Sequence, residues 1–387
     1  MIKQLFLLLF LTVLLSACGS EEDNAEPPTE LHDFKASLDI QELWSASTGG
    51  SDSQQYLKLR PLVTQKNIFT VSRDGDVEAF DPATGDSRWD TSLETQISAG
   101  VGGNAEQLLV CSQDGYLISL DANGKQQWRV DIKNEVLAPP VIADNLVLLR
   151  TIDGKVLAYT HDSGKLVWGY KRDEPALTLR GTSEPLVNNG DVYIGFDNGR
   201  LVSLKLSDGT AVLDKAVSIP QGRTELDRIV DIDGDMAIQD GRIYSANYQG
   251  RAVAISLYRG QIDWARAMSS YTGVLVHGNT VFLSDQQDNV WALDINNGAT
   301  LWKQDKLKYR QLTRPVFYKG AIVVGDYAGY LHFLSPYDGH FIGRYQVDDA
   351  GILVAPVVVG DNLAILSRAG RLSVITASSV AEDASSQ

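Results

Sequence analysis

One pattern recurs along most of the chain with a period of about forty residues, which limits the fold to repeat architectures such as solenoids, propellers or arrays. Its clearest copy, DGYLISLDANGKQQW, runs from Asp114 to Trp128 and contains a tight turn, an alternating strand, a second turn and the start of another strand. Asn123-Gly124 in the second turn predicts a type I′ hairpin. The second-turn glycines are Gly85, Gly124, Gly164, Gly209, Gly260, Gly298 and Gly339. Four residues after each lie Trp89, Trp128, Trp168, Leu213, Trp264, Trp302 and Gly343.

The content of each unit predicts a propeller blade. Short apolar runs such as NIFTVS, QLLVCS and DVYIGF alternate with turn signals, and helical periodicity is not evident in any unit. About four short strands fit into forty residues, so the eight units predict an all-β, eight-bladed propeller of four-stranded blades. Trp44 holds an outer-strand position without the preceding turn, and the last unit stops soon after LSVIT. We therefore expect the N-terminal strand to complete the last blade, which leaves no open sheet edge.

The segment Asp81-Pro-Ala-Thr-Gly85-Asp-Ser-Arg-Trp89 resembles the pyrroloquinoline-quinone-type propeller repeat. Dehydrogenases with this repeat use a catalytic Asp, a bound calcium and, in many cases, adjacent cysteines. Here the only cysteines are Cys18 and Cys111, the five histidines lack metal-ligand spacing, and no catalytic motif is present. The sequence therefore predicts no enzyme, no cofactor and no metal site. Two alternatives stay open: a small PQQ-dependent quinoprotein dehydrogenase, and a propeller that binds peptidoglycan or sugar.

The N-terminus predicts a lipid-anchored protein. MIKQLFLLLFLTVLLSAC has a short positive start and an apolar run too short for a membrane span, which predicts a signal peptide over residues 1–17. Its end resembles a bacterial lipobox, which implies lipidation of Cys18 and, because no Asp follows, the periplasmic face of the outer membrane. Residues 18–37 are predicted to be a flexible tether, 38–377 the propeller and 378–387 a disordered tail.

Function in a propeller is expected where the repeat departs from its minimum. The two longest internal connections are consecutive, one after Trp168 and one after Leu213, and they contain YKRDEPALTLRGTSEP and DKAVSIPQGRTELDRIVDIDGDM. Apolar residues beside an Arg, facing a loop rich in acids, match the composition of a protein-binding patch. The alternative is a pair of solvated loops in which Arg180 pairs with an Asp. The net charge of −15 without a Lys/Arg cluster argues against nucleic acid.

The lipobox, the acidic tether, the propeller and the strings LTLRGTSEP and ELDRIVDIDGDM together resemble the BamB family of lipoproteins, part of the outer-membrane β-barrel assembly (Bam) machinery. The resemblance implies a non-catalytic scaffold that binds the periplasmic POTRA domains of BamA and assists folding and insertion of β-barrel proteins. It places partner binding on Leu177, Leu179, Arg180, Asp231 and Asp233. The acids would receive a basic group from the partner or orient the loop. A looser expectation is that unfolded outer-membrane protein precursors bind at blade edges by strand addition.

Overall fold

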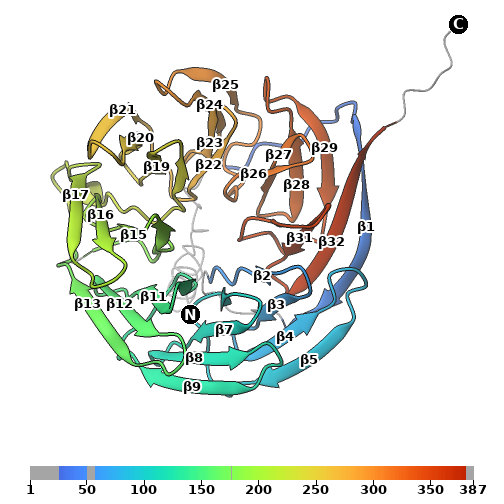
Figure 1. Ribbon diagram of the computed structural model, residues 1–387. Helices are drawn as coiled ribbons and strands as arrows, with labels where there is room; N and C mark the ends of the chain where they lie inside the picture. Colours follow the sequence, from blue (N-terminus) through green and yellow to red (C-terminus); the bar gives the residue numbers. More distant parts are fainter. Residues whose placement is uncertain (1–25, 50–56, 176, 381–387) are drawn as a thin grey trace, which may run out of the picture.

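The strands form a closed ring of eight four-stranded antiparallel sheets, shown in Figure 1. The computed structural model describes residues 26–49, 57–175 and 177–380. Successive strands within a blade run from the centre of the ring to its rim, where β5, β9 and β13 are visible in Figure 1. The predicted all-β, eight-bladed propeller is confirmed.

The first four blades in chain order, each from inner to outer strand, are β2 (Leu62–Val63), β3 (Ile68–Val71), β4 (Asp76–Phe80), β5 (Ser87–Ser92); β6 (Gly102–Gly103), β7 (Gln107–Cys111), β8 (Tyr116–Asp121), β9 (Gln126–Asp131); β10 (Val141–Ala143), β11 (Leu146–Arg150), β12 (Lys155–Thr160), β13 (Leu166–Lys171); β14 (Leu186–Asn188), β15 (Asp191–Gly195), β16 (Arg200–Lys205), β17 (Ala211–Ala216). The remaining four are β18 (Ala237–Gln239), β19 (Arg242–Ala246), β20 (Arg251–Ser256), β21 (Gln261–Ala267); β22 (Val274–His277), β23 (Thr280–Ser284), β24 (Val290–Asp294), β25 (Thr300–Gln304); β26 (Val316–Tyr318), β27 (Ala321–Gly325), β28 (Tyr330–Leu334), β29 (Phe341–Gln346); β30 (Val357–Val359), β31 (Asn362–Leu366), β32 (Arg371–Ser379), β1 (Leu38–Ser47).

The ring is closed by the two ends of the folded chain. Strand β1 pairs antiparallel with β32 over a register from Leu38 opposite Ser379 to Ser47 opposite Arg371. The predicted completion of the last blade by the N-terminal strand is therefore confirmed. Strand β32 ends at Ser379, so pairing extends past residue 377, where the propeller was predicted to end.

Within the flexible tether predicted for residues 18–37, the described part, residues 26–37, contacts the propeller. From Thr29 onward it lies against the blade of β26–β29 and the connection that leads into it, where the Thr29 N–H donates to the Lys308 carbonyl at 2.9 Å. The ring centroids of Phe34 and Phe341 are 5.4 Å apart, and Leu31 packs on the apolar cluster between blades. The prediction weighed the acidic composition of the stretch and overlooked these two apolar side chains, whose burial stabilises the contact.

The recurring Trp and Gly form the seams between blades. The Trp128 indole N–H donates to the His161 carbonyl of the next blade at 2.9 Å. A Cβ on Gly164 would lie 2.7 Å from the Trp128 ring, so only glycine permits this approach. The same bond to the next blade is made by Trp44, Trp89, Trp168, Trp264 and Trp302. Gly343 interrupts the series because its neighbour is β1, which has no preceding turn; Ile40 and Leu38 pack there instead.

The second-turn hairpin is longer than the type I′ turn predicted at Asn123-Gly124. Strand β8 ends at Asp121 and β9 begins at Gln126, and only Gly124 has a positive φ, of 80°, in the turn between them. The Asp121 carboxylate accepts the N–H groups of Asn123 and Lys125 at 2.9 and 3.0 Å. An Asp at the first position thus stabilises a four-residue loop in which one glycine suffices.

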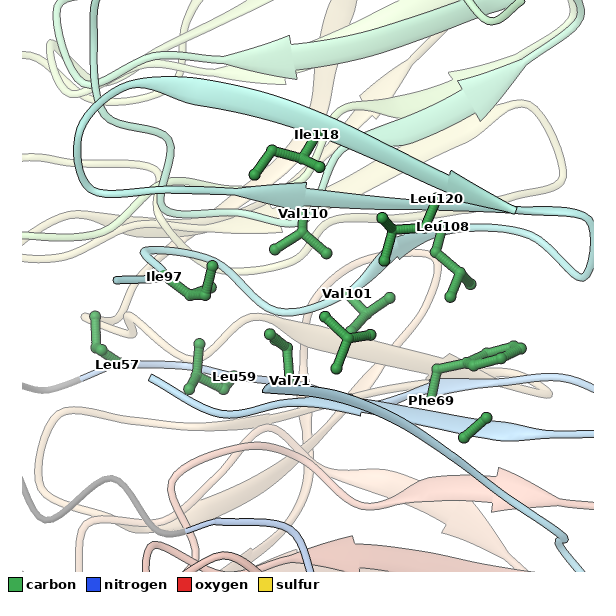
Figure 2. Close-up of a cluster of buried hydrophobic side chains, with 12 residues drawn as sticks. Leu57, Leu59, Phe69, Val71, Ile97, Val101, Leu108, Val110, Ile118 and Leu120 are labelled. Atoms are coloured by element: carbon green, nitrogen blue, oxygen red, sulfur yellow. The ribbon is translucent and has the colours of Figure 1, made fainter. Parts of the chain in front are cut away.

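Apolar side chains fill the space between neighbouring blades. Figure 2 shows one such cluster, in which Phe69 and Val71 of one blade face Leu108, Val110 and Ile118 of the next. Because each blade is twisted, successive faces meet at an angle and the seam is filled from both sheets. This packing holds the blades rigidly, and the blades fix the ends of the connecting loops.

Candidate functional site

Two long connections emerge from adjacent blades on the same face of the propeller. The first loop, residues 172–185, joins β13 to β14, and the second loop, residues 217–236, joins β17 to β18 and contains a short 3-10 helix, η2 (Leu226–Arg228). Each loop begins with the same kind of backbone hydrogen bond. The Arg172 N–H donates to the Gly154 carbonyl and the Val217 N–H to the Gly199 carbonyl, each at 2.9 Å. Since Gly154 and Gly199 are first-turn glycines, the repeat itself fixes where each loop starts.

The first loop presents apolar and cationic side chains to solvent. Leu177 is 40% exposed and Leu179 is half-buried. The Arg180 side chain is 50% exposed and forms an ion pair of 2.6 Å with Glu135, from the connection between β9 and β10. The ion pair expected between Arg180 and an Asp therefore exists with a Glu of a third loop. An exposed pair of this kind contributes at most about 1 kcal/mol to stability and leaves Arg180 available to another carboxylate.

The two predicted acids of the second loop lie beneath the first loop, not beside it. Asp231 is 0% exposed and Asp233 is 5% exposed. The Asp231 carboxylate accepts the backbone N–H of Leu179. A Cβ on Gly181 would lie 3.0 Å from an Asp233 carboxylate oxygen, so the first loop touches this acid at a glycine. Of the two roles expected for these acids, their burial favours orienting the loop over direct contact with a partner.

A buried ionic cluster continues below these acids. Arg150, at the end of β11, is fully buried, and its Nη2 contacts the Asp197 carboxylate as well as Glu174 Oε1 at 2.9 Å. Asp197 follows β15, and Glu174 belongs to the first loop. One oxygen from each of Asp197, Asp231 and Asp233 lies within 4.8 Å of the others. Four carboxylates therefore gather around one buried guanidinium.

This crowding shifts the protonation of the acids. Burial, followed by the charges of Asp233 and Asp197, raises the pKa of Asp231 to about 8. Burial and the charge of Asp197 raise the pKa of Glu174 to about 7. Burial likewise raises the pKa of Asp233, and the nearby Arg150 and Lys58 oppose that shift. Perturbed carboxyls of this kind mark candidate functional sites, although structural ion clusters also produce them.

Asp235, the last acid of the second loop, belongs to a separate network at the ring axis. Its carboxylate lies 3.3 Å from Arg60 and 3.3 Å from Arg314, and Arg60 also pairs with Glu184. These residues line a cavity of about 80 Å³ on the face that carries the two loops. The far end of the second loop is thus attached to the first and seventh blades, a role that its sequence did not indicate.

The sequence pattern predicted that the two loops form one site, but it did not indicate that four further residues belong there: Glu135, Arg150, Glu174 and Asp197. Arg150 ends an ordinary strand and Asp197 lies in an ordinary turn after one, at positions where the repeat shows no irregularity. What distinguishes these two residues is that their charged side chains are buried. That burial becomes visible only once the neighbouring blades are placed. The predicted signal peptide (residues 1–17), Cys18, the start of the tether (residues 19–25) and residues 381–387 of the predicted tail lie outside the described residues.

Comparisons with known proteins match this architecture over nearly the whole chain. The family model described as "Outer membrane protein assembly factor BamB" matches residues 73–304. Proteins of that name from Yersinia pestis and Pseudomonas aeruginosa are 34% and 37% identical, covering 97% and 95% of this chain and 99% and 97% of their own. The chain belongs to the BamB family. The crystal structure of BamB from Moraxella catarrhalis superposes with a TM-score of 0.80 at 28% identity, covering 87% of this chain and 99% of that one.

Quinoprotein enzymes share the fold alone. A quinohemoprotein alcohol dehydrogenase from Pseudomonas putida superposes with a TM-score of 0.70, but it is only 12% identical and this chain covers 78% of it. The relation to BamB therefore rests on sequence and fold together, whereas the relation to the dehydrogenases rests on the eight-bladed ring. Among the described residues, no helix has the length and apolar character needed to cross a membrane.

Proposed function

We propose that this chain is a non-catalytic scaffold of the Bam complex, which binds the periplasmic POTRA domains of BamA and assists folding and insertion of outer-membrane β-barrel proteins. The relatives named as outer membrane protein assembly factors, which match almost end to end, support the assembly role. The site supports a binding role, because its most irregular surface is an exposed loop held from below by buried acids.

In this proposal the first loop makes the contact. Leu177 and Leu179 bury apolar surface in the partner. Arg180 binds a carboxylate of the partner at the rim of the interface, either in place of Glu135 or together with it. Arginine and large apolar side chains that become desolvated carry most of the binding energy in protein interfaces. Asp231 and Asp233 act from beneath: one holds the Leu179 amide and the other supports Gly181.

The proposal includes the placement of the protein. Residues 1–17 act as a signal peptide, and Cys18 carries the acyl chains that anchor the protein at the periplasmic face of the outer membrane, since two or more chains give stable attachment. The propeller then begins within a short distance of the membrane surface, because the chain is docked from Thr29 on the seventh blade and the connection that leads into it. Strand addition of unfolded precursors at outer strands stays a prediction.

Binding of the soluble periplasmic region of BamA, measured by biolayer interferometry, tests the proposal. We expect wild type to bind and Leu177→Ala/Arg180→Ala to lose at least tenfold in affinity, about 1.4 kcal/mol. The matched control is Leu301→Ala/Arg259→Ala, which removes an exposed leucine and an ion-paired arginine from other blades. A wild type that fails to bind contradicts the function, whereas equal binding of all three proteins places the interface elsewhere.

A further inference from the structure

Three aspartates from two blades converge at one buried point. Asp197 lies in the turn after β15, whereas Asp231 and Asp233 lie near the end of the second loop. All three are buried, and one carboxylate oxygen from each lies within 4.8 Å of the other two. Oxygen atoms at such separations can coordinate a single ion, since calcium binds oxygen ligands at about 2.3–2.6 Å.

A fourth carboxylate, from a different element, belongs to the same cluster. The Glu174 side chain is 7% exposed, and its Oε1 binds the same Arg150 nitrogen that contacts Asp197. Its Oε2 makes no hydrogen bond to any described residue, and the same is true of the Oδ1 atoms of Asp231 and Asp233. Buried carboxylate oxygens without a donor are rare, because each forfeits its hydration without compensation.

The charges of the cluster do not balance on their own. Four carboxylates face the guanidinium of Arg150, and the ammonium of Lys58 acts on Asp233 from the ring axis. In the described part of the chain, neither Asp231 nor Asp233 takes part in a salt bridge. With all four carboxyls ionised, a divalent cation would bring the sum of these formal charges to zero, and isolated charges are very costly to bury.

We propose that Asp197, Asp231 and Asp233, with Glu174 at the border of the site, bind a hard divalent cation such as calcium. Oxygen-only ligands on flexible loops suit calcium better than magnesium, which demands a small octahedral site. The Asp-Ile-Asp sequence of the second loop supplies two ligands. The ligands that a calcium loop would take from its own sequence come here from the neighbouring blade and the first loop.

The proposed cation would act on the first loop through Asp231, whose second oxygen holds the Leu179 amide. A cation that fixes this carboxylate also fixes the amide that it binds. The site goes beyond the scaffold function, because its geometry does not depend on a partner. Cation binding can therefore be measured on the protein alone, so its failure is distinct from a failure of partner binding.

Isothermal titration of CaCl2 into the EDTA-treated full chain tests the proposal. We expect one site with a dissociation constant at or below about 10⁻³ M, the range of extracellular calcium modules. Asp197→Asn, which changes no residue of either loop, should abolish the binding heat. The matched control is Asp288→Asn, which changes a buried aspartate of another blade and should leave binding unchanged. Binding that survives Asp197→Asn overturns the location.

A second measurement covers the case in which Asp197→Asn does not fold, as judged by its melting curve. Crystals of wild type soaked in TbCl3, a calcium substitute, should show an anomalous peak within coordination distance of Asp231 and Asp233. A wild type that takes up no calcium at 10 mM and shows no terbium peak at this cluster overturns the proposal.

Discussion

The seams between blades and the ionic cluster beneath the first loop are both buried, but their interactions are of opposite kinds. At a seam, an indole ring packs on a glycine, and its one polar atom donates to a carbonyl of the next blade, as Trp302 does to Pro336 at 2.9 Å. Beneath the first loop, Arg150 and four carboxylates are buried together, and several of their polar atoms have no partner among the described residues. The seam repeats around the ring, whereas the ionic cluster occurs under one pair of loops.

The contrast explains how one ring can be both rigid and specific. Apolar burial with the indole N–H paired adds stability without directing any particular loop. A buried ionic cluster adds little stability on balance, but its members hold their neighbours in one arrangement. We therefore expect seam substitutions to change unfolding with little effect on binding by the folded protein, and cluster substitutions to change both.

The largest expected effects compare Trp302→Ala with Arg150→Met. Trp302→Ala should lower the free energy of unfolding by about 3–5 kcal/mol, the cost of a large cavity. Arg150→Met should lower the free energy of unfolding by a similar amount at pH 8, because it leaves the buried carboxylates without the guanidinium that pairs with them. Urea denaturation gives both values. Binding to BamA, measured under folding conditions, should persist in Trp302→Ala and fall in Arg150→Met; the reverse pattern contradicts the division of roles.

A smaller effect isolates the contact that makes the seam. Gly298 and Gly241 have nearly equal φ values of 69° and 70°, but a Cβ on Gly298 would lie 2.7 Å from the Trp264 ring, whereas Gly241 has open space. Substitution by Ala should cost about 1–2 kcal/mol at either position for the left-handed backbone. Gly298→Ala should cost about 1–3 kcal/mol more for displacing the ring. Equal melting temperatures of the two variants would show that the approach of ring and glycine contributes nothing.

The smallest effect on stability is expected at the exposed ion pair of the first loop. Arg180→Ala breaks the pair with Glu135 and should change the free energy of unfolding by less than about 1 kcal/mol, because the side chain is half exposed. Glu135→Gln serves as its partner variant, since it breaks the same pair and keeps the arginine. If Arg180 contacts BamA, only Arg180→Ala should weaken binding. Weakening of equal size in both variants would assign the effect to the ion pair itself.

The repeat explains why the fold could be predicted and the site only in part. Spacing of Trp and Gly predicted blades, seams and closure, because each is set by contacts that recur at a fixed period. The loop residues Leu177 and Arg180 were found as an interruption of that period. Arg150 and Asp197 interrupt nothing, since one ends a strand of regular length and the other lies in a regular turn, and their meeting depends on the angle between blades. No local pattern encodes that angle.

The burial of Asp231 and Asp233 escaped prediction for a related reason. Charged residues in a long loop are usually solvated, so an acidic loop predicts an exposed surface. Here the first loop crosses over the second and covers both acids, an arrangement that depends on a contact between residues 52 positions apart in sequence. Only the structure distinguishes an acid that meets a partner from an acid that supports the loop above it.

The central claim is that Asp231 positions the first loop and does not itself touch the partner. Its most direct test compares BamA binding by wild type, Asp231→Asn and Asp231→Leu. Asn keeps an oxygen that accepts the Leu179 N–H, so we expect it to retain binding within about threefold of wild type, whereas Leu should lose at least tenfold. If Asn weakens binding as strongly as Leu while amide exchange at Leu179 stays as slow as in wild type, then the charge of Asp231 acts on the partner directly and the claim is wrong.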